Sequence, residues 1–150
     1  MFHSIVEAVF HYADTQPDKL CLIDDKSQVT YQEYFEKIKK YAACFKEAGL
    51  NAKDTVVVEA CQTIEYLAIE LALQLLGIIF VPVEHNCAVE KIRSFVERAE
   101  AKAVIVCKED TYDIEHNYTF DMLAELCEKA EPYAPQTLPL ETDVSEVLFS

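Results

Sequence analysis

The chain has 150 residues, of which 51% are hydrophobic, enough for one domain with a buried core and too few for two independent domains. Its 27 acidic and 13 basic residues give a formal charge of −14, which disfavours nucleic acid and anionic membrane surfaces as partners. The longest apolar stretch, residues 67–83, is interrupted by Glu70, Gln74, Gly77 and Pro82, so we expect a cytoplasmic protein without a membrane-spanning helix.

The first predicted element is an amphipathic helix. Ser4 followed by Glu7 has the form of a capping box, which begins a helix, and residues 16–18, with Pro17 at their centre, would end it. Its apolar residues Ile5, Val9 and Tyr12 are expected to face one way.

Two short strands joined by a tight polar turn are expected next. They cover residues 20–24 and 28–31, with residues 25–27 as the turn. Asp24 and Asp25 could also be paired carboxylates for a metal ion. Aspartate at a hairpin turn usually bonds to its own backbone, so we interpret both as turn residues.

From residue 30 the pattern alternates between helix and strand. Thr30 with Glu33 forms a second capping box, and Gly49 supplies a left-handed position at the end of that helix. The β-branched run of residues 56–58 is typical of a buried strand, and Thr63 can cap the helix that follows.

The helix after Thr63, ending before Gly77, is apolar around nearly its whole circumference. Such a helix needs cover on more than one side, so we expect it to lie between the sheet and another layer, and we interpret it as a sign of a neighbouring domain. Its apolar residues are Ile64, Leu67, Ile69, Leu71, Leu73 and Leu75.

Strands are then predicted at residues 78–83 and 103–107, with a helix between them that Asn86 could cap. Residues 108–118 are predicted to be an acidic loop. Thr119 is expected to cap a last helix, which carries Leu123 and Leu126 as apolar residues. Within the acidic loop, Asp110, Asp113 and Glu115 lack the spacing of a calcium-binding loop, and a solvated face is the better interpretation.

The end of the chain predicts a proline-rich linker over residues 131–142 and a buried strand at residues 146–150. Parallel strands need long crossovers, so the whole pattern predicts one α/β subdomain over residues 1–150. It has a mostly parallel sheet flanked by helices in three layers and one short N-terminal β-hairpin. Open parallel sheets bind ligands at the carboxyl ends of their strands, so the chemistry is expected beyond Ser150.

Six segments of the chain form a characteristic series: QPDKLCLID from Gln16, VTYQEY from Val29, AGL-x5-VVV from Ala48, LQLLGIIFVPVE from Leu73, AKAVIV from Ala101 and DVSEVLFS from Asp143. In their order and spacing they resemble the N-terminal portion of the adenylate-forming (AMP-binding) superfamily, which includes acyl-CoA synthetases, adenylation domains of peptide synthetases and luciferases. In that family the last strand leads into a Ser/Thr/Gly-rich phosphate loop that ends in a lysine. The resemblance assigns only the first position of this loop, Ser150, to the chain.

The resemblance implies that the intact protein is a ligase, which joins a carboxylic acid to ATP, releases pyrophosphate and passes the acyl group to a thiol such as coenzyme A. ATP, Mg²⁺ and coenzyme A are implied for that enzyme, whereas this chain alone is expected to bind none of them and to be inactive. Its partner would be the remainder of its own polypeptide. The resemblance assigns no catalytic residue and no metal ligand to this chain.

Two turns depart from the family pattern. Residues 84–87, Glu-His-Asn-Cys, stand where members often have Asn-Pro or Asp-Pro, and residues 59–61, Glu-Ala-Cys, replace a commoner Asn-containing turn. These departures leave the subfamily and the acyl preference open.

The six cysteines show no C-x-x-C pair and no paired histidines at metal-ligand spacing, so we expect them to be reduced and mostly buried. Cys61 and Cys107 follow predicted strands, and His85 lies on a loop at the same edge, where a nucleophile could act. No basic residue or helix start lies beside either thiol in the sequence, so a structural role is the better interpretation.

A second function class stays open at this point. The chain could be a freestanding, non-catalytic α/β module that binds a partner through the helix around residues 67–76 or through residues 109–150, which hold 11 acids and one base, Lys129. Self-association distinguishes the two hypotheses. A fragment should expose apolar surface and form a homo-oligomer or aggregate, whereas an evolved module should be a defined species.

Overall fold

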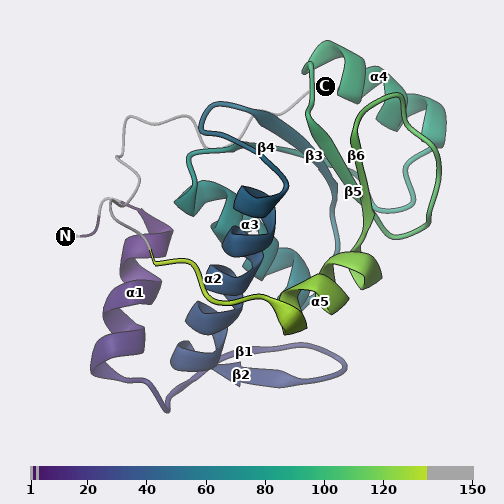
Figure 1. Ribbon diagram of the computed structural model, residues 1–150. Helices are drawn as coiled ribbons and strands as arrows, with labels where there is room; N and C mark the ends of the chain where they lie inside the picture. Colours follow the sequence, from purple (N-terminus) through teal and green to yellow (C-terminus); the bar gives the residue numbers. More distant parts are fainter. Residues whose placement is uncertain (1, 3, 135–150) are drawn as a thin grey trace.

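A parallel sheet separates two layers of helices in the computed structural model, which describes residues 2 and 4–134 (Figure 1). Within these residues the sheet has four strands in the order β4-β3-β5-β6. The strands are β3 (Thr55–Glu59), β4 (Ile79–Val83), β5 (Ala103–Val106) and β6 (His116–Thr119). The prediction of a mostly parallel α/β fold is confirmed.

Alternate residues of the central strand β3 face opposite layers. Val56 and Val58 belong to a large core with the helices on one face, and Val57 belongs to a smaller core with the helix on the other. All three valines are fully buried because strands flank β3 on both sides. Pro82, which cannot donate to a ladder, lies on the edge strand β4.

The helix α2 (Tyr31–Glu47) begins with the predicted capping box. The Thr30 hydroxyl accepts from the Glu33 backbone N–H, and the Glu33 carboxylate accepts from the Thr30 backbone N–H. Beyond the helix, Gly49 has φ of +86°, the left-handed value predicted for it.

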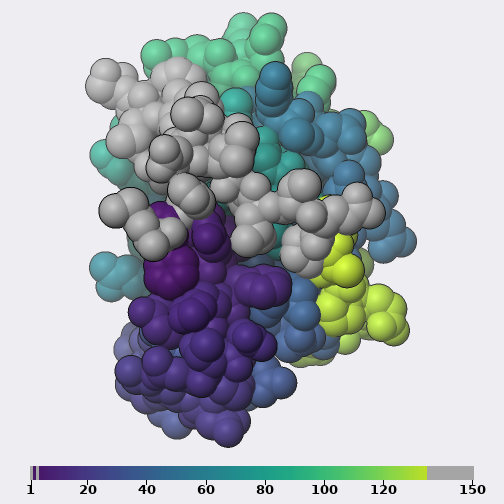
Figure 2. Space-filling model, turned by 90° about the vertical axis from the view of Figure 1, so that its left-hand side faces the viewer, coloured from purple at the N-terminus to yellow at the C-terminus, as the bar shows by residue number. Residues whose placement is uncertain are grey.

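The N-terminal helix α1 (Ile5–Thr15) packs against α2 and forms much of the lower part of one face of the molecule (Figure 2, purple). Its predicted cap is confirmed, because the Ser4 side chain accepts from the Glu7 backbone N–H. Ile5, predicted to share a face with Val9, is 61% exposed, whereas Val6 and Val9 are buried. Helix α1 begins at Ile5 and packs on the core through the face that contains Val6, so Ile5 lies on an exposed face.

Helix α3 (Ile64–Leu75) begins at the predicted cap Thr63 and lies between the sheet and other helices. Its cover comes from the chain itself, since α1, α2 and α5 (Phe120–Lys129) all contact it (Figure 1). Leu67, at 36% exposed, is its least covered large apolar residue among those described. Among the described residues, these three helices supply cover for the apolar circumference of α3.

The predicted hairpin is present as β1 (Leu20–Ile23) and β2 (Gln28–Thr30), which pair antiparallel. It lies below the helices and apart from the main sheet in Figure 1. A backbone hydrogen bond from Asp24 to Ser27 closes its turn.

Helix α4 (Val89–Arg98), which covers the opposite face of the sheet, is not capped by Asn86 as predicted. Its N-cap is Ala88, whose side chain makes no capping bond. Asn86 instead has φ of 59°, a left-handed conformation that asparagine tolerates better than most residues, and its backbone N–H faces β3.

The acidic loop predicted at residues 108–118 is shorter than expected, because β6 begins at His116. The sequence His-Asn-Tyr-Thr has no β-branched run, so the strand depends on its parallel pairing with β5. Thr119 caps α5 as predicted, with Leu123 buried and Leu126 46% exposed.

The predicted linker at residues 131–142 is described only for residues 131–134, which form no regular element. The predicted strand at residues 146–150 lies outside the described residues. None of the helices described between residues 4 and 134 is long and apolar enough to cross a membrane.

The face of α5 that packs on the core can be tested with two leucines of the same helix. We expect Leu123→Ala to lower the free energy of unfolding by about 2–5 kcal/mol, because Leu123 is buried in the large core. Leu126→Ala, the matched control, should change it by no more than about 0.5 kcal/mol. Urea denaturation of both variants measures the difference, and equal losses would contradict this packing of α5.

A candidate functional site at the carboxyl edge of the sheet

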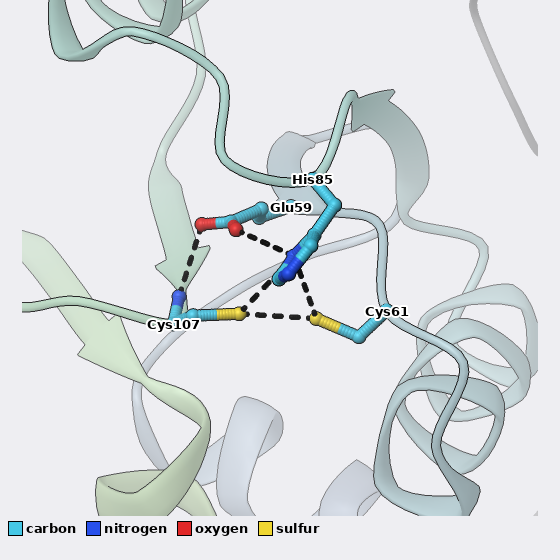
Figure 3. A group of neighbouring side chains, drawn as sticks. All are labelled: Glu59, Cys61, His85 and Cys107. Atoms are coloured by element: carbon cyan, nitrogen blue, oxygen red, sulfur yellow. Dashed lines mark hydrogen bonds and ion pairs between the residues drawn. The ribbon is translucent and has the colours of Figure 1, made fainter.

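Four side chains that can bind metals or protons meet at the carboxyl edge of the sheet (Figure 3). Glu59 ends β3 and Cys61 follows two residues later, His85 follows β4, and Cys107 follows β5 directly. The strands are parallel and adjacent, so their carboxyl ends bring these four residues to one place. β3 and β5 are neighbours, but the chain continues from β3 to β4 on one side and from β5 to β6 on the other side. The carboxyl ends of β3 and β5 therefore form a topological switch point, which is where open sheets bind ligands.

The four side chains point towards one another (Figure 3). The Sγ atoms of Cys61 and Cys107 are 3.1 Å apart, and the His85 Nδ1 lies 3.9 Å from each of them. The same Nδ1 is 3.0 Å from Oε2 of Glu59. The cluster is open to solvent on one side, because the His85 side chain is 56% exposed and that of Glu59 only 7%.

Glu59 is held by backbone donors of two loops. The Cys107 N–H donates to Oε1 and the Asn86 N–H donates to Oε2, both at 3.1 Å. Burial alone would raise the pKa of Glu59, but these hydrogen bonds and the neighbouring His85 outweigh it, so the pKa of Glu59 lies below its usual value. The carboxylate is therefore an ionised acceptor fixed at the end of β3.

The thiols of this site are poor nucleophiles in the chain as it stands. Burial raises the pKa of Cys107, and its hydrogen bonds with Cys61 and Glu59 raise it further. Burial also raises the pKa of Cys61, although its hydrogen bond with Cys107 acts in the opposite direction. A reactive cysteine needs a lowered pKa, so this geometry favours the structural interpretation of both thiols over catalysis.

The six cysteines are free, as predicted, but the expectation that most of them are buried is wrong. Only Cys127 is buried, and Cys107 is exposed. The reason is local: Cys61 and Cys107 come just after their strands end, so their side chains lie on the edge loops rather than between the layers.

The sequence placed Cys61, Cys107 and His85 at one sheet edge but did not join them, and it missed Glu59 as their common neighbour. One signal in the sequence could have joined them. Each of the four residues lies no more than two residues from the end of one of three parallel strands. The order of those strands, with β3 between β4 and β5, was needed to convert this signal into a cluster.

A hollow of about 760 Å³ lies elsewhere, between α4 and the loop before β6, and is lined by Arg93, Tyr112 and their neighbours. Arg93 there donates to Asp110 at 3.2 Å and to the Thr111 carbonyl at 3.0 Å. Asp110, one of the acids of this loop, is thus paired with the guanidinium of Arg93.

The sequence model of one enzyme family, described as AMP-binding enzyme, matches residues 9–146, nearly the whole chain. The chain belongs to the AMP-binding enzyme family. The match spans the hairpin, the sheet and all of the edge loops that carry the cluster.

Similar members of the AMP-binding family include two bacterial ligases. The vibriobactin-specific 2,3-dihydroxybenzoate-AMP ligase of Vibrio cholerae is 34% identical over 63% of this chain and 17% of its own length. The D-alanine–D-alanyl carrier protein ligase of Streptococcus pneumoniae is 30% identical over 67% of this chain and 20% of its own length. The chain thus spans about a fifth of the length of these relatives.

The chain shares its fold with a solved structure. The N-terminal subdomain of NpsA from Klebsiella oxytoca, in complex with 3-hydroxybenzoyl-AMSN, superposes with a TM-score of 0.87 at 21% identity. The superposition covers 99% of this chain and 38% of that one.

The AMP-binding family implies ATP, and the described residues do not fit its phosphates. Ser150, the residue predicted to begin the phosphate loop, lies outside the described part of the chain. At the described carboxyl edge the side chains are a carboxylate, two thiols and an imidazole rather than small residues with free backbone donors. No step of ATP chemistry is therefore assigned to Glu59, Cys61, His85 or Cys107.

Asp24, weighed above as a metal ligand, is a turn residue as predicted. Its Oδ1 accepts from the backbone N–H groups of Lys26 and Ser27, both at 2.8 Å. Its Oδ2 also accepts from the Ile64 N–H at 2.9 Å, which ties the hairpin to the start of α3. This bond with Ile64, followed by the two turn bonds, keeps the pKa of Asp24 below its usual value.

The contribution of Asp24 to stability should depend on pH. A carboxylate whose pKa is lowered by folding stabilises the protein above its unfolded pKa of about 3.9 and loses this effect as pH falls through the lower folded value. Asp24→Asn should therefore lower the urea midpoint at pH 7, by an amount that shrinks towards pH 3. The exposed neighbour provides the control, Asp25→Asn, which should have a smaller effect; a deficit independent of pH would contradict this assignment.

Proposed function

We propose that this chain forms the N-terminal part of an adenylate-forming ligase, which joins a carboxylic acid to ATP, releases pyrophosphate and transfers the acyl group to a thiol. The observation that carries the proposal is the match of the AMP-binding family over residues 9–146. The share of the relatives that the chain spans, about a fifth, supports its being one part of a longer enzyme.

The role proposed for these residues is to build the sheet edge beside which the nucleotide and the acid bind, with ATP and Mg²⁺ as cofactors of the intact enzyme. Open parallel sheets bind ligands outside their carboxyl ends, and β3, β4 and β5 end together here. The phosphate contacts are expected from Ser150 and the sequence of the same gene after it. The chain alone should therefore be inactive.

The names of the relatives favour a carrier protein as the thiol acceptor. One relative is a D-alanyl carrier protein ligase, and another match is a hybrid PKS-NRPS synthetase of Emericella nidulans. Coenzyme A, the acceptor expected from the resemblance to acyl-CoA synthetases, is the alternative, and the assay below includes both. A cytoplasmic location forms part of the proposal because the reaction consumes ATP.

The remainder of the polypeptide is the proposed partner of three exposed apolar residues in the N-terminal segment. Phe2, which precedes α1, is 40% exposed, and Ile5 and Phe10 of α1 are 61% and 42% exposed, although α1 otherwise packs on the core. Isolated exposed residues are common, but three in one N-terminal segment favour cover by further protein surface. Without that cover the same surface would favour a homo-oligomer of the chain.

The decisive assay is ATP–pyrophosphate exchange by the protein made from the complete native reading frame. We expect exchange that depends on one class of acid in a panel of aryl acids, amino acids and fatty acids, including 2,3-dihydroxybenzoate and D-alanine. The 150-residue chain should show none with the same panel. Adding coenzyme A or a phosphopantetheinylated carrier protein then identifies the acceptor by the formation of its thioester.

Two results would contradict the proposal. Exchange by the 150-residue chain alone would show that the nucleotide site needs no further sequence. A native reading frame that ends at Ser150 would remove the ligase and leave the non-catalytic binding module, whose partners would then be sought with the acidic residues 109–150.

A further inference from the structure

The side chains at the carboxyl edge of the sheet form a donor set typical of zinc. They offer two sulfurs, one imidazole nitrogen and one carboxylate oxygen, and these four atoms all lie within 4.8 Å of one another. Cysteine, histidine and carboxylate are the ligands of tetrahedral zinc sites, and two thiolates favour zinc over magnesium or calcium. We propose that Glu59, Cys61, His85 and Cys107 together bind one Zn²⁺ ion, whether or not the chain belongs to an active ligase.

The separations of the donor atoms suit an ion of this size. Zinc–ligand bonds of about 2.0–2.3 Å place tetrahedral ligands about 3.3–3.8 Å apart. The described separations are 3.0 Å from Glu59 to His85, 3.1 Å between the two sulfurs and 3.9 Å from His85 to each sulfur. These four pairs therefore need adjustments of less than about 1 Å to surround the ion.

The exposed side chains can make this adjustment, and the buried one holds the site in place. His85 and Cys107 are exposed and lie on loops, so they can move towards an ion that arrives from solvent. Glu59 is buried, ends the central strand and accepts the N–H groups of Asn86 and Cys107. Hydrogen bonds of this kind orient the ligands of metal sites and increase their affinity.

A bound ion would hold the donor atoms of the cluster together. A divalent cation attracts the carboxylate and both thiolates at once. Four protein ligands would close the coordination sphere, which is the arrangement of structural rather than catalytic zinc. The ion would tie together the loops that follow β3, β4 and β5.

A disulfide between Cys61 and Cys107 explains the arrangement less well. Their sulfurs are 3.1 Å apart, whereas a disulfide bond is about 2.05 Å long. The position of His85, equally distant from both sulfurs, also has no role in a disulfide. A disulfide is therefore the competing outcome that the experiment must detect.

The test is a zinc titration of the reduced, chelator-treated 150-residue chain without an affinity tag. Competition with a chromophoric chelator should give one Zn²⁺ per chain. Co²⁺ should give the visible d–d bands of a tetrahedral site together with thiolate-to-metal charge transfer in the near ultraviolet. Cys61→Ser and Cys107→Ser should each weaken zinc binding by at least about 100-fold. Loss of a residue that only hydrogen-bonds to a metal ligand already lowers metal affinity by about 10–100-fold.

The matched control is Cys87→Ser, which removes a half-buried thiol from the same edge of the sheet but outside the donor set. It should leave the zinc affinity and the cobalt spectrum unchanged. Circular dichroism checks that the variants fold. If either ligand variant fails to fold, alkylation of the unmodified protein decides instead: Zn²⁺ should protect Cys61 and Cys107 and leave the reactivity of Cys87 unchanged.

The proposal is overturned if the reduced chain binds no zinc, or if the cobalt spectrum lacks thiolate charge transfer. It is also overturned if Cys87→Ser weakens binding as much as Cys61→Ser does. A Cys61–Cys107 disulfide that persists in the isolated protein, with no zinc bound after its reduction, would assign the cluster to redox chemistry.

Discussion

The parallel pairing of β3 with β4 on one side and β5 on the other is the constraint on which the rest of the structure depends. It buries Val56, Val57 and Val58 completely and assigns alternate side chains to two separate cores. Parallel pairing also requires long connections, which become α3 on one face and α4 on the other. The same pairing aligns three strand ends, so the chemistry available to the chain is concentrated in the loops at one edge.

Local signals determined much of this architecture and could be taken from the sequence. The caps Thr30, Thr63 and Thr119 were predicted correctly because a hydroxyl before a helical segment acts within one turn of its helix. Asn86 has the same chemical capacity and failed as a prediction, because the chain uses its left-handed conformation to direct its N–H group to Glu59. β6 was missed since its pairing with β5, rather than its composition, makes it a strand.

The candidate site could be predicted only in part, for a related reason. The positions of Cys61, His85 and Cys107 at strand ends follow from the sequence, but their meeting depends on the order of the strands and on the direction of three loops. In the sequence Glu59 is only part of a turn that departs from the family pattern. Its burial and its two backbone donors show that it is the fixed residue of the cluster. The match to the AMP-binding family covers the same residues and assigns none of these roles.

Asp24 has a consequence for where a nucleotide can bind. The first turn of a helix that follows a parallel strand is a common phosphate site, because its N–H groups and the helix dipole attract an anion. In this chain the start of α3 already faces an anion of the protein itself, since the Asp24 carboxylate accepts the Ile64 N–H, and the neutral Thr63 hydroxyl accepts the N–H of Tyr66. A phosphate group would have to displace this negative charge, which disfavours the first turn of α3 as a phosphate site.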